Sequence, residues 1–166
     1  GKSKRLAERK LAELEIASVI LRPTAIYGPR EKEIFVIIQT LLKGIDAYIG
    51  SRPQQLSFVY ATDVADAAIN ALQLPVKGIF NISDGNRYGK YDFADTYKRL
   101  FHKKALRVHL PQSAVRSLAF SLEKINRWYH KPTMLSREKL NELMAENWIC
   151  DISKAKQELN FMPKYN

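Results

Sequence analysis

The stretch that decides the fold is Ile16-Ala17-Ser18-Val19-Ile20-Leu21-Arg22-Pro23-Thr24-Ala25-Ile26-Tyr27-Gly28-Pro29. Its first part, residues 16–21, is a short run of mostly aliphatic and β-branched side chains, which predicts a buried strand of a parallel sheet. Pro23 ends this strand, and Gly28 followed by Pro29 predicts a turn in the loop beyond it. We therefore expect a buried strand that opens directly into a loop.

Helices and strands alternate along the rest of the chain. Apolar residues at helical spacing predict helices, and short β-branched runs between turn residues predict strands. The expected helices cover residues 2–15, 33–43, 62–74, 91–103, 111–129, 137–145 and 153–159, and the expected strands cover 47–49, 56–60, 79–82, 106–110 and 148–150. We expect Thr62 or Asp63 and, further on, Asp151 to act as helix N-caps. The alternation predicts an α/β fold with a helix-rich second half.

Length and composition fit one globular domain. The chain has 166 residues, of which 46% are hydrophobic and 27% are charged, as in an ordinary globular protein. Its one cysteine, Cys150, excludes an internal disulfide, fits a reducing compartment and is expected to be a small core residue. We find no signal peptide and no apolar run near the ~20 residues that span a bilayer, so no membrane partner is expected.

The formal net charge of +10 raises the question of an anionic partner. The basic residues are spread along the chain, and the densest group alternates with acidic and apolar residues on the first predicted helix, as on a solvated face. No recognition motif accompanies the charge, so we expect no nucleic-acid partner. His102, His109 and His130 lie far apart with no ligand spacing, so no metal site is expected either.

The start of the chain, Gly1-Lys2-Ser3-Lys4, leads into an amphipathic helix, the strand that ends at Pro23 and the segment Ile26-Tyr27-Gly28-Pro29. This order resembles the middle of an extended short-chain dehydrogenase/reductase, of the NAD-dependent epimerase/dehydratase family. Members carry Tyr-x-x-x-Lys, and Lys4 fits the lysine, which would place the tyrosine one position before Gly1. We therefore expect the chain to be the C-terminal half of an enzyme, beginning just after its catalytic tyrosine.

The resemblance implies a fold and a set of site residues. The fold would be the C-terminal part of a Rossmann-type doubly wound sheet plus a helix-rich substrate lobe. Residues 1–30 would end the dinucleotide-binding domain, and residues 31–166 would form mostly the substrate-binding lobe with returning Rossmann elements. Lys4 would be catalytic and, with Pro23 and Thr24, would bind NAD or NADP. The substrate contacts would be Ala25, Tyr27, Arg30 and Arg52, and Lys90 and Tyr91 are further candidates in the substrate lobe.

The implied activity is that of an NAD(P)-dependent epimerase, dehydratase or reductase acting on a hydroxyl or ketone centre of a small-molecule substrate. Many nucleotide-sugar members have an asparagine where Ala25 stands and an arginine near Leu56. The apolar residues here look more like those of steroid- or flavonol-type members, which favours an apolar ring ketone. The alternative is a non-catalytic binding module that uses its basic surface for an anionic partner.

Further expectations concern the chain by itself. Without a glycine-rich phosphate loop or the tyrosine it should be inactive. An open sheet edge makes a homo-oligomer possible. We expect the enzyme to be cytoplasmic.

Overall fold

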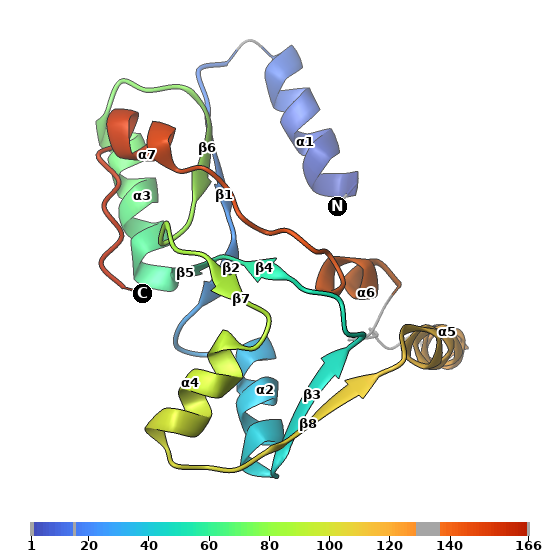
Figure 1. Ribbon diagram of the computed structural model, residues 1–166. Helices are drawn as coiled ribbons and strands as arrows, with labels where there is room; N and C mark the ends of the chain where they lie inside the picture. Colours follow the sequence, from blue (N-terminus) through green and yellow to red (C-terminus); the bar gives the residue numbers. More distant parts are fainter. Residues whose placement is uncertain (1, 15, 129–136, 166) are drawn as a thin grey trace. The chain divides into compact units, whose positions relative to one another are not determined.

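The chain forms two compact units (Figure 1). The computed structural model describes residues 2–14, 16–128 and 137–165. Unit 1 comprises Gly1–Glu31, Leu56–Tyr88 and Trp148–Asn166, and unit 2 comprises Lys32–Gln55 and Gly89–Asn147. Two short strands, β4 (Gln55–Leu56) and β7 (Tyr88–Gly89), contain points where the chain passes from one unit to the other.

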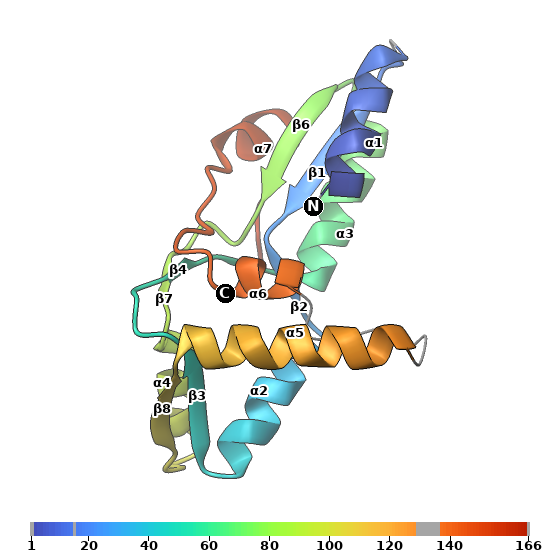
Figure 2. The ribbon, with the colours of Figure 1, turned by 90° about the vertical axis from the view of Figure 1, so that its right-hand side faces the viewer.

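Unit 1 is built on pairs of parallel strands. Its elements are α1 (Lys2–Glu13), β1 (Val19–Pro23), β2 (Ala25–Tyr27), β5 (Phe58–Tyr60), α3 (Ala61–Gln73), β6 (Gly78–Ile82) and α7 (Ser153–Glu158). β1 pairs with β6 in the register Val19 to Gly78, and β2 pairs with β5 in the register Ala25 to Phe58. Figures 1 and 2 show β1 and β6 side by side. α3 packs against β1 and β5, and α7 packs against β6.

The core of unit 1 joins segments that are far apart in the sequence. Its fully buried members come from β5, α3, β6 and the C-terminal region: Val59, Ala67, Phe80, Ile82, Ile152, Ala155, Leu159 and Phe161. Cys150 is half-buried against this core, as expected for a small apolar residue, and burial raises the pKa of its thiol. The Asn70 side-chain amide donates to the carbonyl of Leu159 at 2.9 Å. Both contacts fasten the C-terminal region to the rest of the unit.

Unit 2 contains a second parallel pair. Its elements are α2 (Glu33–Leu42), β3 (Ile45–Ile49), α4 (Asp92–Leu100), β8 (Leu106–Leu110), α5 (Gln112–Trp128) and α6 (Arg137–Leu143). β3 pairs in parallel with β8, with Ile45 opposite Leu106. A small core joins α5 and α6, where Val115, Ala119 and Leu140 are buried. The predicted alternation of helices and strands is therefore confirmed in both units.

Three strand predictions were wrong in detail. The first strand begins at Val19 rather than Ile16, and β2 follows it where a loop was expected. The strand predicted over 56–60 is interrupted at Ser57, whose buried hydroxyl donates to the carbonyl of Asn86. Residues 148–150 form no strand, since the bridge in that region joins Asn147 to Gln55. Side-chain composition favours extended backbone at these places, but pairing partners decide where a strand forms.

The N-cap predicted at Thr62 or Asp63 was wrong. The helix begins at Ala61, and its N-cap residue Tyr60 makes no side-chain cap bond. Asp63 lies in the first turn and is only 1% exposed. Its carboxylate accepts main-chain N–H groups from the far end of the chain, those of Lys164 at 3.2 Å and Tyr165 at 3.3 Å. The N-cap predicted at Asp151 was also wrong by one position, since the N-cap residue of α7 is Ile152, although the Asp151 carboxylate accepts the N–H of Ser153 at 2.9 Å.

Replacing Asp63 by Ala should lower the free energy of unfolding by about 2 kcal/mol, because the main-chain N–H groups of Lys164 and Tyr165 lose a charged acceptor. The matched control is Asp66→Ala, which removes the exposed ion pair with Lys164 and should cost less than about 1 kcal/mol. Urea unfolding followed by circular dichroism compares the two variants. Equal losses would show that Asp63 does not hold the C-terminal segment.

Candidate functional site

The first candidate site lies at the carboxyl ends of β1 and β6. The two strands run parallel and end together, with Pro23 opposite Ile82. Directly beyond β1, the main-chain N–H of Thr24 donates to the carbonyl of Ile82 at 3.0 Å, and its hydroxyl lies 3.4 Å from the same oxygen. Ligands of open α/β sheets bind outside such strand ends. The N–H and hydroxyl of Thr24 are therefore already engaged, while Pro23 is exposed beside them.

The first turn of α1 lies at this same end of the sheet. α1 runs in the direction opposite to β1, so that its N-terminal end is beside the end of β1 (Figure 1). Lys4 is in this turn and is exposed. The guanidinium of Arg22 on β1 binds both carboxylate oxygens of Glu8, at 2.5 and 3.0 Å, and this bond holds the pKa of Glu8 below its usual range. Glu8 is one turn after Lys4, so the pair fastens the Lys4 end of α1 to β1.

Aromatic rings line β2, β5 and the segment after β6. Tyr27 is half-buried and meets Tyr60 and Phe58 edge-on, with ring centroids 5.1 and 6.4 Å apart. Phe58 in turn contacts Tyr88 at 5.4 Å, and Tyr60 contacts Tyr165 at 4.5 Å. Ala25 lies opposite Phe58 in the β2–β5 register. Two of the predicted substrate residues, Ala25 and Tyr27, therefore belong to a largely aromatic surface.

Asp84 fixes the loop that follows β6. Its carboxylate accepts the hydroxyl of Tyr88 at 2.5 Å and the main-chain N–H of Asn86 at 2.9 Å. Burial, and then this bond, raise the pKa of Tyr88 to about 12. Burial and the charges of Asp84 and Asp63 also raise the pKa of Tyr27. Both phenols are therefore neutral at physiological pH, and neither stands four residues before a lysine, so neither replaces the tyrosine that the resemblance implies.

The predicted arginine contacts lie in different units. Arg30 follows Tyr27 in unit 1, is exposed, and has a φ of 71° in a turn closed by a bond from the N–H of Glu31 to the carbonyl of Gly28. Arg52 belongs to unit 2, where it is exposed and pairs with Glu146 at 3.0 Å. Arg30 is therefore in the same unit as the aromatic surface and three positions after Tyr27, whereas Arg52 is in the other unit.

Lys90, a further candidate for a substrate contact, is a buried cation of unit 2. Its ammonium donates to three carbonyl oxygens at the end of β3 and just beyond it, those of Ile49 at 3.1 Å, Gly50 at 2.8 Å and Arg52 at 3.3 Å. Burial lowers the pKa of Lys90. No sequence pattern predicts that a lysine will bind main-chain carbonyls, so the sequence could not reveal this role of Lys90.

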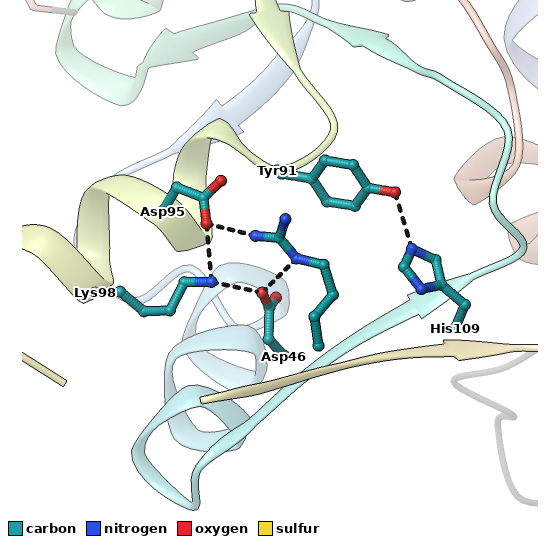
Figure 3. A network of polar contacts seen from close by, with 6 residues as sticks. Asp46, Tyr91, Asp95, Lys98 and His109 are labelled. Carbon is teal, nitrogen blue, oxygen red and sulfur yellow. Dashed lines mark hydrogen bonds and ion pairs between the residues drawn. The ribbon is translucent and has the colours of Figure 1, made fainter. Parts of the chain in front are cut away.

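A second cluster of polar groups lies in unit 2 (Figure 3). The carboxylate of Asp46 is 3% exposed and binds Lys98 at 2.9 Å and Arg107 at 3.0 Å. Asp95 binds both of these cations from α4. Burial alone would raise the pKa of Asp46, but hydrogen bonds from Tyr48, Lys98 and Arg107 lower it overall. Asp46 is therefore ionised and fully compensated.

Rings complete this cluster. The hydroxyl of Tyr91 lies 2.8 Å from Nε2 of His109, and Figure 3 shows the two side chains pointing toward each other. Arg107 lies over the ring of Tyr91 at 4.2 Å, and Tyr48 meets that ring edge-on at 4.8 Å. The strand register could have revealed the cluster, since Asp46 is opposite Arg107 and Tyr48 is opposite His109 on one face of the β3–β8 pair. Its charges balance internally, which favours a structural role.

Residues 2–14, 16–128 and 137–165 contain neither a group of metal ligands nor a membrane-spanning helix. No three His, Cys, Asp or Glu side chains in these ranges group as metal ligands. No helix there is long and apolar enough to cross a membrane.

Comparisons with known proteins identify a family and a relative that match this chain. The model of the 3-beta hydroxysteroid dehydrogenase/isomerase family matches residues 6–97. A ceramide reductase of Caulobacter vibrioides is 23% identical over 149 residues, which cover 88% of this chain and 47% of that protein. The chain thus spans about half the length of this relative.

Solved structures show the same fold and the same partial coverage. The UDP-glucuronic acid 4-epimerase of Bacillus cereus, in complex with UDP-glucuronic acid and NAD, gives a TM-score of 0.70 at 19% identity, over 98% of this chain and 45% of that one. The UDP-glucose 4-epimerase of Thermotoga maritima, with UDP-glucose, gives 0.69 at 19% identity, over 99% and 47%. The predicted Rossmann-type α/β fold and the resemblance to extended short-chain dehydrogenases/reductases are confirmed.

Replacing Asp46 by Asn should lower the free energy of unfolding at neutral pH by about 2 kcal/mol, because Lys98 and Arg107 lose their charged acceptor. The pKa of Asp46 is lower in the folded chain than in the unfolded chain. Its stabilisation is therefore present above pH ~4 and is lost as the pH falls through the folded pKa. The difference in the free energy of unfolding between wild type and Asp46→Asn should therefore become smaller as the pH falls below ~4.

Urea unfolding at a series of pH values measures this gap. The control is Glu146→Gln, which breaks the exposed pair with Arg52 and should change stability by less than about 1 kcal/mol. A gap that stays constant from neutral to acid pH would contradict the assigned role of Asp46.

Proposed function

The chain belongs to the 3-beta hydroxysteroid dehydrogenase/isomerase family, and we propose that it is the C-terminal half of an NAD(P)-dependent enzyme. The enzyme would interconvert a hydroxyl and a ketone, as an oxidoreductase or within an epimerase or dehydratase cycle. The observation that carries the proposal is the first turn of α1 beside the carboxyl ends of β1 and β6. A cytoplasmic location is part of the same proposal.

Lys4 is the residue we assign to the chemistry. Within the part of the chain that the structure describes, its ammonium has no hydrogen-bond or ion-pair partner, so it is available to a ligand. A tyrosine four residues earlier would lie on the same helix face, one turn away. The nearby ammonium would lower the pKa of that phenol from ~10 toward neutrality, and the phenol could then exchange a proton with the substrate hydroxyl.

The residues at the strand ends fit a nicotinamide cofactor by position. Lys4 would donate to the ribose, and Pro23 and Thr24 would meet the nicotinamide end. Because the N–H and hydroxyl of Thr24 are bonded to Ile82, we assign Thr24 a packing and main-chain carbonyl role rather than a donor role. The cofactor, when bound, supplies the hydride chemistry, and the protein supplies position and the proton path.

We propose a lipophilic alcohol or ketone as the substrate, in preference to a diphosphate sugar. Ala25 and the rings of Tyr27, Phe58 and Tyr88 offer apolar contact, and Leu56 stands where a cation would be expected for a diphosphate. Burying a diphosphate without its arginine forgoes a charge-assisted bond worth about 2 kcal/mol. Of the two predicted arginine contacts, Arg30 is the one in the same unit as this surface, since Arg52 is paired with Glu146 in unit 2. The family name and the ceramide reductase relative agree with this preference.

The chain alone should bind neither NAD nor NADP at micromolar concentration. Its sequence holds no glycine-rich loop that could cradle the pyrophosphate at a helix N-terminus. Calorimetric titration of the purified chain measures this. Tight binding would contradict the division of the cofactor site that we propose.

In the full-length enzyme, Lys4→Ala should lower kcat/KM by about a hundredfold or more, because general acid–base catalysis contributes factors of that size. The limb of the pH–rate profile that the phenol sets should also move to higher pH, since the phenol loses a neighbouring cation; this is the acidic limb for oxidation of the hydroxyl and the basic limb for reduction of the ketone. Lys10→Ala is the matched control on the same helix, where Lys10 pairs with Glu13, and it should stay within about twofold of wild type.

Two outcomes would contradict the proposal. One is a Lys4→Ala enzyme with unchanged kcat/KM. The other is a gene that encodes neither a tyrosine before Gly1 nor a glycine-rich loop upstream. Efficient turnover of a UDP- or dTDP-sugar, with none of steroid- or ceramide-type ketones, would reject the substrate class alone.

A further inference from the structure

We propose that one end of unit 2 docks on an anionic membrane surface. This end, called the basic–apolar tip below, consists of the α2–β3 turn, residues 42–45, and the α4–β8 connection, residues 99–106. Figures 1 and 2 show the C-terminal end of α2 and the starts of β3 and β8 at the same end of the unit. The inference goes beyond the proposed enzymatic activity and does not rest on it.

Backbone bonds hold the two parts of the tip together. β3 and β8 are parallel, so both begin at this end, with Ile45 opposite Leu106. The N–H of Leu106 donates to the carbonyl of Gly44 at 2.8 Å, across the two connections. In the α4–β8 connection, His102 has a φ of 49°, and the N–H of Lys103 closes the turn on the carbonyl of Lys98 at 3.1 Å. The tip is therefore one continuous surface on a bonded frame.

Large apolar side chains stand out from this surface. Leu42 is 60% exposed, Leu100 65%, Phe101 60% and Leu106 73%. Single exposed apolar residues are common on proteins, but a group of them at one end of a unit marks an interaction site. Two of the four, Leu100 and Phe101, are consecutive at the end of α4, and Leu106 begins the strand that follows.

The same surface is strongly basic. Residues 98–107 include five Lys or Arg side chains and one His, and no acid. Lys98 and Arg107 are compensated by Asp46 and Asp95 at the inner side of the tip. The exposed cations are Lys43, Arg99, Lys103 and Lys104, and none of them forms an ion pair among the described residues. The outer side of the tip therefore carries uncompensated positive charge.

Exposed leucine and phenylalanine ringed by free cations fit the surface of an anionic bilayer. Apolar side chains enter the region between headgroups and acyl chains, while nearby Lys and Arg side chains are attracted to the charge of anionic lipid. A nucleic acid would use the charge but would leave Leu100 and Leu106 without a partner. A second copy of the chain would bring like charges such as Lys103 and Lys104 together. Charge and apolarity together thus select the membrane.

Vesicle co-sedimentation tests the docking with the chain as it is. Wild type should bind vesicles that contain phosphatidylcholine and phosphatidylglycerol, should bind pure phosphatidylcholine weakly, and should be released by salt. Lys103→Glu/Lys104→Glu should weaken binding to the anionic vesicles by about tenfold or more. Phe101→Ser should weaken it by about tenfold at every salt concentration, because the lost contact is apolar.

Matched controls carry the same changes on unit 1. Lys77→Glu/Lys156→Glu reverses two exposed charges, and Leu72→Ser removes a leucine that is 87% exposed. Both controls should bind as wild type does. Circular dichroism melting of all four variants establishes that each is folded.

Several results would overturn the proposal. These are equal binding to neutral and anionic vesicles, tip variants that bind as tightly as the controls, and an RNA oligonucleotide that binds while vesicles do not. Light scattering can give one further contradicting result. If the chain is a dimer that Phe101→Ser dissociates, and if it does not bind vesicles, the tip is a self-association surface instead.

Discussion

The buried carboxylate of Asp63 is the interaction that closes unit 1. It sits in the first turn of α3 and accepts N–H groups of Lys164 and Tyr165, which are about a hundred positions away in sequence. Without these donors the carboxylate would be a buried charge with no hydrogen-bond partner. The same contact carries Tyr165 to the ring of Tyr60, and through Tyr60 to Tyr27. The aromatic surface of the candidate site is thus built partly from the last described residues.

Charges have different tasks in the two units. Asp63 and Asp46 are both nearly inaccessible, yet Asp63 is satisfied by main-chain N–H groups and Asp46 by two cations. Lys90 is the reverse case, an ammonium satisfied by carbonyl oxygens alone. Exposed pairs such as Arg22 with Glu8 add little energy but set geometry, because two parallel bonds from a planar guanidinium fix an orientation. In this molecule the buried charges stabilise the fold, whereas the exposed Arg22–Glu8 pair fixes the position of a helix.

Sequence patterns predicted the helices and turns, whose formation depends on residues that are neighbours along the chain. The helices over residues 33–42 and 92–100 follow from apolar spacing, and the turn at Gly28 follows from its residue types. The patterns failed where a distant segment decides. Asp63 looks like a cap, because nothing near it in sequence shows that its partners are Lys164 and Tyr165. Lys90 looks like a surface lysine, and the residues at the strand ends gain their neighbours only when β1 and β6 pair.

Unit 1 is assembled from three separate stretches of chain, and this determines the order in which the protein can form on a ribosome. All of unit 2 lies between the first and last of these stretches, so its strands and helices emerge before Lys164 and Tyr165 are made. During synthesis β1 and β6 can pair, but the core side chains Ile152, Leu159 and Phe161 arrive only with the final part of the chain. Until then the inner faces of β6 and α3 stay open to solvent and to chaperones. The core of unit 1 is therefore completed by the docking of a short segment around residues 152–161 rather than by the formation of a sheet.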